Sequence, residues 1–513
     1  MKPLNITHAC LARHAHEIPD KPALVVVNPD LTEHTVLSYQ RLYKEIARLA
    51  QGLKSLALPA HSPCLLRCHK NLDFVLLFFA AMAAKLVPIS SLSNLTEREE
   101  QFILDNAQPS LLYQQPDIAL SLSLPSHCHE LSYEQLQALK QTPIHPLTIE
   151  TKVQDPAFIT YTSGSTGNPK GVIHAHRTIL GREPLRQDWL NLQAHDRVLH
   201  TGKPCWTYSM GVGFLDTFYR GATVILYLGE DAPDVWFKLI KRYNVSLLAT
   251  SPLYLRAMAS TTPEKDALMS LMRVSSAGEK LPEEIADYWQ QHYAIPVYEA
   301  FGMSEMSTFI GFGPNIAARK GSVGKVQQNR KIALLPIDGG TAPVPTGQTG
   351  LLAIHTDNEG FMLGYFKRED EMQQQLRGQW FITGDLMRQD ADGYMWYMGR
   401  YDDVLNVAGG HRVSPIEIED IMQQHPAIKQ MVCHLSKHGT VDNYLTATIV
   451  LNDNHMASNT LAKTIHAWCQ EKLSDNKVPR LIQFIDHLPT KTTGKIDRKA
   501  TAQISCQVYA FCP

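Results

Sequence analysis

The segment at residues 161–172 constrains the fold of this chain more than any other part of the sequence. It reads Tyr-Thr-Ser-Gly-Ser-Thr-Gly-Asn-Pro-Lys-Gly-Val, and residues 157–160 before it, Ala-Phe-Ile-Thr, predict a short buried strand. Glycines allow successive backbone N–H groups to turn inward into a nest that suits phosphate oxygens. The hydroxyl groups add hydrogen-bond donors, and Lys170 adds a positive charge. The sequence therefore predicts a phosphate-binding loop directly after a strand.

This loop differs from the P-loop of ordinary NTPases, because no Gly-Lys-Ser/Thr triplet opens a helix here. A plain surface loop is the alternative, since runs of Ser, Thr and Gly commonly form such loops. The apolar strand before the loop and a set of matching motifs downstream favour phosphate binding.

Five segments of the chain together resemble the adenylate-forming superfamily, which contains acyl-CoA synthetases, peptide-synthetase adenylation domains and luciferases. The loop at 161–172 is the first of them, and the other four follow in the order of the family. They are residues 298–305, 383–385, 399–403 and 489–495. Residues 274–279 and 413–419 are most similar to those of benzoate-type and medium-chain CoA ligases. The resemblance implies an AMP-forming carboxylate–CoA ligase.

The chain is predicted to be an α/β protein with more than one domain. Its 513 residues exceed what one hydrophobic core usually organises. Between residues 196 and 255, short apolar strands alternate with helical patterns, which indicates strand–helix–strand units and largely parallel sheets. The Gly- and Pro-rich stretch at 339–350 indicates a β-rich region, and an α+β pattern follows residue 400.

The family resemblance divides the chain into two domains. It implies a large AMP-binding domain at residues 1–400, made of αβ subdomains and a β-rich subdomain, and a small mobile C-terminal domain at 401–513, with a hinge at Asp402. Residues 408–412 form a loop that is one residue longer than is usual in the family. The tail at 504–513 extends beyond many relatives, and we expect it to be a frayed terminus.

The resemblance also assigns roles to site residues. Lys495 pairs with the carboxylate and the α-phosphate, Glu305 holds Mg²⁺, and Ser304 directs a hydroxyl group at the α-phosphate. Phe301 stacks on adenine, whereas Asp385 and Arg400 hold the ribose. The full set implied for ATP binding is Thr162, Ser163, Gly164, Ser165, Thr166, Gly167, Lys170, Ala277, Gly278, Glu279, Glu299, Phe301, Gly302, Asp385 and Arg400.

By position in the family, the acid-binding pocket is expected to involve two aromatic residues, Trp206 and Tyr208, which narrow it. No acidic or cationic side chain is evident among its expected residues, so an apolar acid is predicted, either aromatic or short- to medium-chain aliphatic. The predicted pocket residues are Trp206, Tyr208, Gly213, Ser276 and Met303. His174 and His176 follow the phosphate loop, and structural roles are favoured for them over acid–base catalysis.

Composition excludes several other classes of protein. A formal net charge of −2 gives no electrostatic case for binding nucleic acid. The apolar run at 74–84 is too short to span a bilayer and predicts a buried helix. Nine dispersed cysteines without a visible secretion signal predict reduced thiols and a cytoplasmic location. Cys64, Cys68 and His69 lack the second ligand pair that a zinc site requires.

Two other functions remain open at this stage. A stand-alone adenylation enzyme would load an acyl or aminoacyl group onto the phosphopantetheine arm of a carrier protein, although no carrier domain is fused here. A non-catalytic nucleotide sensor could share the fold, but Glu305, Asp385 and Lys495 are all retained. The family resemblance of residues 489–495 further implies that a protein acetyltransferase could modify Lys495.

Overall fold

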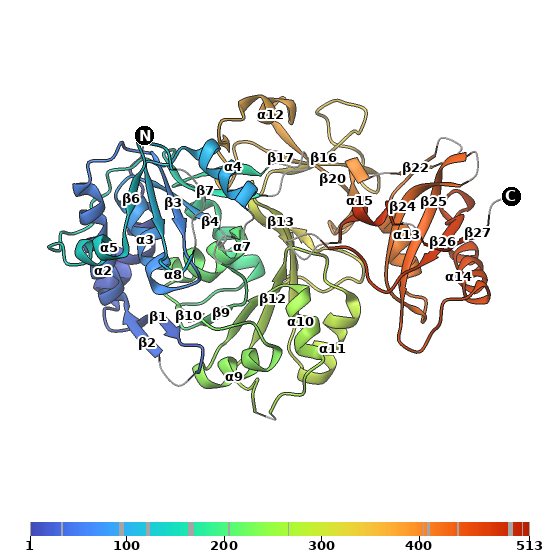
Figure 1. Cartoon of the computed structure of the whole chain (residues 1–513), viewed down its shortest axis with the longest axis horizontal. Helices are drawn as coiled ribbons and strands as arrows, with labels where there is room; N and C mark the ends of the chain where they lie inside the picture. Colours follow the sequence, from blue (N-terminus) through green and yellow to red (C-terminus); the bar gives the residue numbers. More distant parts are fainter. Residues whose placement is uncertain are drawn as a thin grey trace. The chain divides into compact units, whose positions relative to one another are not determined.

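The computed structural model describes residues 2–31, 34–91, 97–118, 124–162, 169–203, 206–264, 266–403, 405–407, 411–438, 441–490, 496–504 and 506–511. The chain forms two compact units (Figure 1). The first unit contains residues 1–332, 355–381 and 392–395, and the second contains 333–354, 382–391 and 396–513.

The first unit contains a nine-stranded sheet in the order β15-β14-β13-β12-β11-β9-β10-β1-β2. The strands from β13 to β1 are parallel, whereas β2, β14 and β15 are antiparallel to their neighbours. The alternation of strands and helices predicted from residue 196 is confirmed. The strands are β1 (Pro22–Val27), β2 (His34–Ser38), β9 (Arg197–His200), β10 (Thr223–Tyr227), β11 (Leu247–Thr250), β12 (Arg273–Ala277), β13 (Val297–Met303), β14 (Ser307–Gly311) and β15 (Lys325–Val326).

Three helices pack on one face of this sheet and can be followed beside its strands in Figure 1. They are α9 (Pro233–Tyr243), α10 (Pro252–Ala259) and α11 (Glu283–Tyr293). Proline at the first position of α9 and α10 presets φ for helix entry and leaves no N–H unpaired. Trp236 on α9 and Trp289 on α11 are buried in the core that these helices form with the sheet. Alternate residues of β1 and β10, among them Leu24 and Val224, belong instead to the main core that includes α2 (Tyr39–Ser55) and α3 (Leu72–Ala83).

A seven-stranded sheet in the order β18-β8-β7-β4-β3-β5-β6 forms the other half of the first unit. The predicted strand at 157–160 is part of β7, which pairs with β8 on the far side of the phosphate loop. The predicted buried helix is α3 (Leu72–Ala83), which is apolar on all sides and lies in the main core. The strands are β3 (Pro63–Arg67), β4 (Val87–Ser91), β5 (Leu111–Gln114), β6 (His129–Leu131), β7 (Pro156–Thr162), β8 (Lys170–Ala175) and β18 (Gly364–Tyr365).

The remaining helical elements of the first unit cover these sheets or connect them. The longer ones are α1 (Ile6–Glu17), α2 (Tyr39–Ser55), α3 (Leu72–Ala83), α4 (Glu97–Ala107) and α5 (Tyr133–Leu139). The shorter ones are α6 (Thr178–Gly181), η1 (Leu185–Trp189), α7 (Thr207–Met210), η2 (Gly211–Asp216), α8 (Thr217–Arg220) and α12 (Glu369–Gln374), and a short strand β19 (Leu376–Arg377) follows α12.

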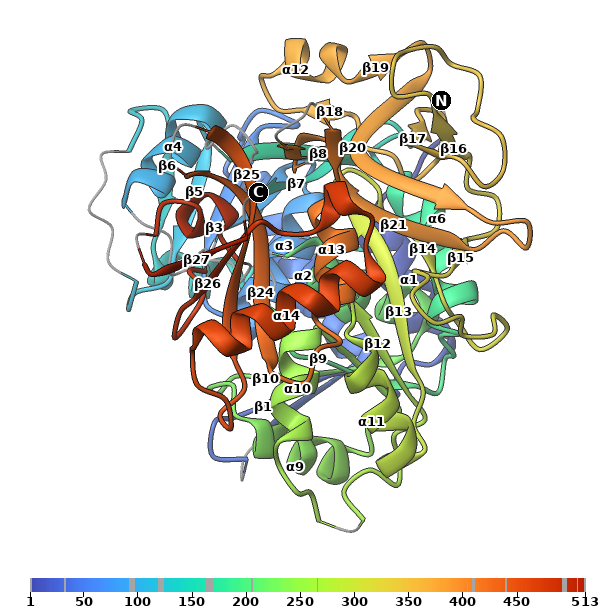
Figure 2. The ribbon, with the colours of Figure 1, turned by 90° about the vertical axis from the view of Figure 1, so that its right-hand side faces the viewer.

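The second unit contains strands from the predicted β-rich region and the C-terminal α+β part. Figure 2 shows α13 and α14 against the four-stranded sheet β24-β25-β26-β27, and Ile418 and Ile465 bury their side chains there. Its elements are β16 (Ile332–Leu335), β17 (Thr349–His355), β20 (Trp380–Gln389), β21 (Met395–Arg400), η3 (Tyr401–Asp403), β22 (Leu405–Val407), β23 (His411–Val413), α13 (Pro415–Met422), β24 (Ile428–His438), β25 (Val441–Leu451), α14 (Asn459–Lys472), η4 (Asp475–Lys477), β26 (Leu481–Phe484), α15 (Arg498–Thr501) and β27 (Val508–Ala510).

The expectation of a frayed C-terminal tail is wrong. Residues Val508–Ala510 form β27, which pairs antiparallel with the edge strand β26. The Phe511 ring stacks on His466 with ring centroids 4.2 Å apart, and its N–H donates to the carbonyl of Arg480. The tail carries apolar side chains that gain by burial, and an open sheet edge offers hydrogen-bonding partners. Pairing and burial together therefore hold residues 508–511 against the second unit.

Three further observations concern disulfide bonds, metal sites and membrane-spanning helices. The seven cysteines within the described ranges are free thiols. In the same ranges, no cluster of three or more His, Cys, Asp or Glu residues could hold a metal ion. Nor does this part of the chain contain a helix with the length and apolar character needed to cross a membrane.

Candidate active site

The two ends of the phosphate loop face each other across a strand pair. Thr162 at the end of β7 is in register with Lys170 at the start of β8, whereas Ser163, Gly164, Ser165, Thr166 and Gly167 lie outside the described residues. Lys170 is buried, and its Nζ lies 2.6 Å from Oε2 of Glu371. Burial favours protonation of Glu371, but the hydrogen bonds from Lys170 and Arg368 outweigh it and lower the pKa of this carboxyl. The loop lysine is thus already paired with an anion.

Tyr365 links this lysine to the predicted magnesium residue. Nζ of Lys170 lies 5.2 Å from the centre of the Tyr365 ring, and the Tyr365 hydroxyl donates to Oε1 of Glu305 at 2.7 Å. Sequence reasoning missed both Tyr365 and Glu371, which are about 200 residues beyond the loop in the chain. Tyr365 therefore contacts a cation through its ring face and a carboxylate through its hydroxyl group.

The carboxylate of Glu305 fits the coordination expected of a magnesium–nucleotide complex. Mg²⁺ is usually held by one or two carboxylates together with substrate phosphates rather than by a cage of protein ligands. The described residues offer no such cage. Beside Glu305, Ser304 accepts a hydrogen bond from the Thr207 hydroxyl at 3.2 Å. Both predicted residues thus lie in the turn between β13 and β14.

The ends of β12 and β13 require small residues at two of the predicted positions. Gly278 has φ +100°, and a Cβ there would lie 2.5 Å from the Trp206 ring. A Cβ on Gly302 would lie 2.4 Å from the carbonyl oxygen of Ser307. Ala277 before the first glycine is buried. The chain therefore passes these points with no room for a larger side chain.

Three other predicted nucleotide residues lie in different surroundings. Glu299 is buried, burial raises its pKa to about 7, and its Oε1 accepts the N–H of Leu281 at 2.9 Å. Glu279 is exposed. Phe301 is half-buried and meets Phe309 at right angles, with ring centroids 5.8 Å apart. Glu299 thus orients the backbone that follows Gly278.

An aromatic cluster forms around the residues predicted for the acid. Trp206 and Tyr208 meet at right angles with ring centroids 5.1 Å apart, and His200 lies 4.5 Å from Tyr208 by the same measure. The Tyr208 hydroxyl donates to the carbonyl of Ser275 at 2.9 Å. A Cβ on Gly213 would lie 3.3 Å from the Cβ of His200. The sequence reasoning did not identify His200 as part of this cluster.

The other predicted pocket residues lie on the neighbouring strands β12 and β13. Ser276 follows Ser275 on β12, is fully buried, and has no hydrogen-bond partner for its Oγ among the described residues. Because side chains alternate along a strand, Ser276 faces away from the side on which Ser275 lies. Met303 at the end of β13 is half-buried.

The histidines after the loop are buried in the strand layer. Burial lowers the pKa of His174 to about 3 and that of His176 to about 4, so both are neutral at neutral pH. His174 stacks on Phe158 with ring centroids 4.7 Å apart, and His176 accepts the N–H of Ile6. This environment agrees with structural roles.

In the second unit, the predicted ribose residues lie together. Asp385 is buried and accepts hydrogen bonds from Tyr397 at 3.3 Å and from Nη1 of Arg400 at 3.4 Å. Burial raises the pKa of Asp385, although Arg400 opposes the shift. Gly384 has φ +81°, and a Cβ there would lie 2.8 Å from the Arg400 guanidinium. Gly384 therefore allows the arginine to lie against the backbone.

The predicted hinge residue lies just after this pair. Asp402 is exposed within the turn η3, with its Oδ2 3.7 Å from Nη2 of Arg400. The division into compact units falls between Met395 and Trp396, within β21, and assigns Asp402 and the residues on either side of it to one unit, so it does not locate a hinge at Asp402. Lys495 and residues 408–410 of the longer loop lie outside the described residues.

Known proteins resemble this chain over nearly its whole length. A benzoate–CoA ligase of Thauera aromatica is 28% identical over 90% of this chain and 89% of its own. An uncharacterized acyl–CoA ligase of Bacillus subtilis is 26% identical over the same shares. The crystal structure of an anthranilate CoA ligase with anthranoyl-AMP superposes with a TM-score of 0.85, at 26% identity, and covers 98% of each chain.

Family models match both parts of the chain. The model of the AMP-binding enzyme matches residues 11–366, and that of the AMP-binding enzyme C-terminal domain matches residues 417–495. The fold class expected from the sequence, α/β with a large N-terminal and a small C-terminal domain, is confirmed. The chain therefore belongs to the AMP-binding enzyme family.

Proposed function

We propose that this protein uses ATP to convert an apolar carboxylic acid into an acyl-AMP and then transfers the acyl group to CoA. The single observation that carries the proposal is the arrangement of Lys170, Tyr365 and Glu305 next to the phosphate loop. A cation and a carboxylate held this close suit a polyphosphate and its magnesium ion. Membership of the AMP-binding enzyme family supports the same reaction.

A carboxylate cannot react with a thiol until its oxygen becomes part of a good leaving group. Attack on the α-phosphate of ATP achieves this and releases pyrophosphate. The main obstacle is the approach of one anion to another, so positioning and neutralisation are the principal means of catalysis. No protein nucleophile is required. The residues of this chain therefore have to hold phosphates, orient the acid and supply positive charge.

Each group of residues takes one of these tasks in our proposal. The loop from Thr162 to Lys170 holds the β- and γ-phosphates, and Lys170 exchanges Glu371 for phosphate oxygens. Glu305 holds Mg²⁺, which when bound neutralises phosphate charge. Ser304 and Lys495 contact the α-phosphate, and Lys495 also contacts the carboxylate of the acid.

The base and sugar of ATP have separate contacts in this proposal. Phe301 offers a ring face to adenine. The buried carboxylate of Asp385, held by Tyr397 and Arg400, accepts the ribose hydroxyls. Both carboxylate oxygens are acceptors, so one side chain can bind two neighbouring hydroxyl groups.

The aromatic cluster of Trp206, Tyr208 and His200 favours an aromatic acid over an aliphatic one. Relatives named as benzoate–CoA and hydroxybenzoate–CoA ligases support this substrate class.

We also propose a cytoplasmic location, which suits a chain with this cysteine content. A carrier protein as acyl acceptor, and acetylation of Lys495 by a protein acetyltransferase, are further proposals that rest on the family resemblance.

The proposal can be tested by identifying the products directly. The protein is incubated with ATP, Mg²⁺ and single acids from an aromatic and aliphatic panel, with either CoA or a phosphopantetheinylated carrier protein, and the products are separated by mass spectrometry. We expect acyl-CoA and AMP with CoA present, most rapidly with an aromatic acid, and no turnover after chelation of Mg²⁺. Acylation of the carrier alone would support the other acceptor. Formation of ADP, or no thioester with any acid, would contradict the proposal.

A further inference from the structure

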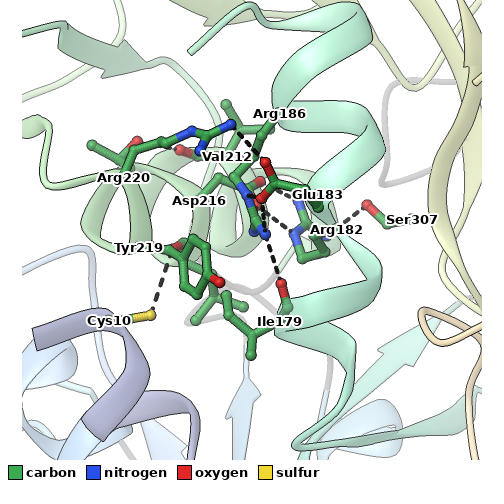
Figure 3. A network of polar contacts seen from close by, with 12 residues as sticks. Cys10, Ile179, Arg182, Glu183, Arg186, Val212, Asp216, Tyr219, Arg220 and Ser307 are labelled. Carbon is green, nitrogen blue, oxygen red and sulfur yellow. Dashed lines mark hydrogen bonds and ion pairs between the residues drawn. The ribbon is translucent and has the colours of Figure 1, made fainter. Parts of the chain in front are cut away.

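A network of buried ion pairs lies in the first unit and is drawn in Figure 3. Its centre is Asp216 on η2, which is fully buried between Arg182 and Arg186. Arg182 donates from Nε to Oδ1 at 2.9 Å and from Nη2 to Oδ2 at 2.6 Å. Arg186 donates from Nη1 to Oδ1 at 3.0 Å. One carboxylate therefore holds two guanidinium groups.

The outer part of the network fixes Arg186. Its Nη2 donates to the carbonyl of Ile179 at 2.8 Å, and its guanidinium lies 4.1 Å from the centre of the Tyr219 ring. Glu183 accepts from Arg186 at 2.8 Å and from Arg220 at 2.8 Å. Charge-assisted and paired hydrogen bonds of this kind strongly restrict orientation. The outer contacts therefore hold Arg186, whereas the orientation of the Arg182 guanidinium is set by its own two hydrogen bonds to Asp216.

Arg182 uses its remaining edge to contact the start of β14. Its Nη1 donates to Oγ of Ser307 at 2.6 Å, and this contact is drawn in Figure 3. Ser307 is buried and has φ +73°, a left-handed conformation that is unfavourable for a residue with a Cβ. A Cβ on Gly211 would lie 2.1 Å from Nη2 of Arg182, so a glycine there leaves room for the guanidinium. The contact thus holds a strained residue in place.

Ser307 closes the turn that carries the two predicted catalytic residues. It is in register with Met303, so Ser304 and Glu305 lie between the two paired positions. The carbonyl oxygen of Thr308, the residue after Ser307, accepts a hydrogen bond from Nη2 of Arg330 at 3.4 Å. Burial lowers the pKa of Arg330 to about 10. The far end of the turn is therefore held by the buried Arg182 and the half-buried Arg330, and a shift of Ser307 would be transmitted to Glu305.

We propose that Arg182, oriented by Asp216, is a positioning residue that fixes Ser307 and thereby holds Ser304 and Glu305 in the geometry that binds Mg²⁺ and ATP. This inference rests on the function proposed above. It gives the buried ion network a role in positioning residues that bind the substrates, although the network itself does not contact the substrates. The alternative is a network that only stabilises the fold, in which case the ligand-binding properties of the turn would not depend on it.

Two substitutions of Ser307 separate these roles. Ser307→Ala removes the acceptor of Arg182 and keeps the strained φ. Ser307→Gly also removes the acceptor but adopts a positive φ without strain. Glu183→Gln is the matched control, because it weakens the outer network and leaves the contact between Arg182 and Ser307 intact. Calorimetric titration with a non-hydrolysable ATP analogue, with and without Mg²⁺, is compared with acyl-AMP formation and thermal stability.

We expect both Ser307 variants to lose at least tenfold in Mg²⁺-dependent affinity for the analogue and in kcat for acyl-AMP formation, while KM for the acid stays the same. Glu183→Gln should lower the melting temperature and leave both ligand readouts at the wild-type level. Full recovery in Ser307→Gly would overturn the proposal, since relief of strain alone would then explain the site. Wild-type magnesium dependence in both variants would overturn it equally. If the unaltered protein fails to form acyl-AMP, the proposed function is at fault instead.

Discussion

Replacing Lys495 by alanine is expected to lower the rate of acyl-AMP formation by roughly 10²–10³-fold, the loss typical when a charge-stabilising donor is removed from a transition state. In our proposal, the ammonium group of Lys495 contacts both the carboxylate of the acid and the α-phosphate of ATP. Thioester formation from supplied acyl-AMP should be largely spared, because in the two-conformation mechanism the C-terminal domain moves Lys495 away before CoA enters. Single-turnover assays of the two half-reactions measure both quantities.

Lys499 provides a matched control for this variant. It is exposed on the short helix α15, four residues beyond Lys495, and its replacement by alanine removes the same charge from the same region. Lys499→Ala should leave both half-reactions unchanged. An equal loss of both half-reactions in Lys495→Ala would show that the lysine does not act in adenylation alone, and the two-conformation mechanism would then fail for this protein.

Asp402→Pro is expected to retain adenylation and to slow thioester formation by on the order of tenfold or more, as for other steps gated by a domain movement. Proline fixes φ and removes the backbone donor, so a hinge at this position would be locked in one orientation. Asp402 lies exposed in the turn η3, where a new side chain meets few neighbours. The same two single-turnover assays report the result.

The carboxylate of Asp402 also lies near Arg400, so its loss has to be separated from the effect of the proline ring. Asp402→Ala serves this purpose, because it removes the carboxylate and keeps the backbone free to rotate. It should show nearly normal thioester formation. If Asp402→Pro retains full ligase activity, the hinge lies elsewhere in the chain.

Local features of the fold were predictable from the sequence. The strands β9, β10 and β11 and the helices α3 and α9 follow from hydrophobic periodicity, which acts over a few residues. The C-terminal strand β27 was missed because its order depends on a free edge of β26, about 25 residues earlier in the chain. A local pattern does not show that such a partner is available.

The residues of the candidate site likewise fall into two groups, those that short motifs identify and those that only long-range contacts bring to the site. Motifs identified the loop lysine, the acidic residue of the β13–β14 turn and the pair of Asp385 and Arg400, because each motif is a short continuous segment. Tyr365 and Glu371 could not be identified so, since Tyr365 comes near Lys170 through the pairing of β18 with β8, and Glu371 lies on α12, which follows β18 in the chain. The contact of Arg182 with Ser307 joins residues 125 positions apart and depends on the buried carboxylate of Asp216. Long-range packing of this kind is not visible in local spacing.

The most direct test of the central claim is acid-dependent exchange of labelled pyrophosphate into ATP, measured with Mg²⁺ and without CoA. Reversible formation of a bound acyl-AMP is the step that distinguishes the proposed ligase from a nucleotide sensor with the same fold. We predict that label enters ATP when a cognate acid, expected to be aromatic, is present, that no label enters without an acid, and that exchange in the Lys495→Ala variant is slower by roughly 10²–10³-fold. Absence of exchange with every acid in a broad panel, from a folded protein that still binds ATP, would contradict the account.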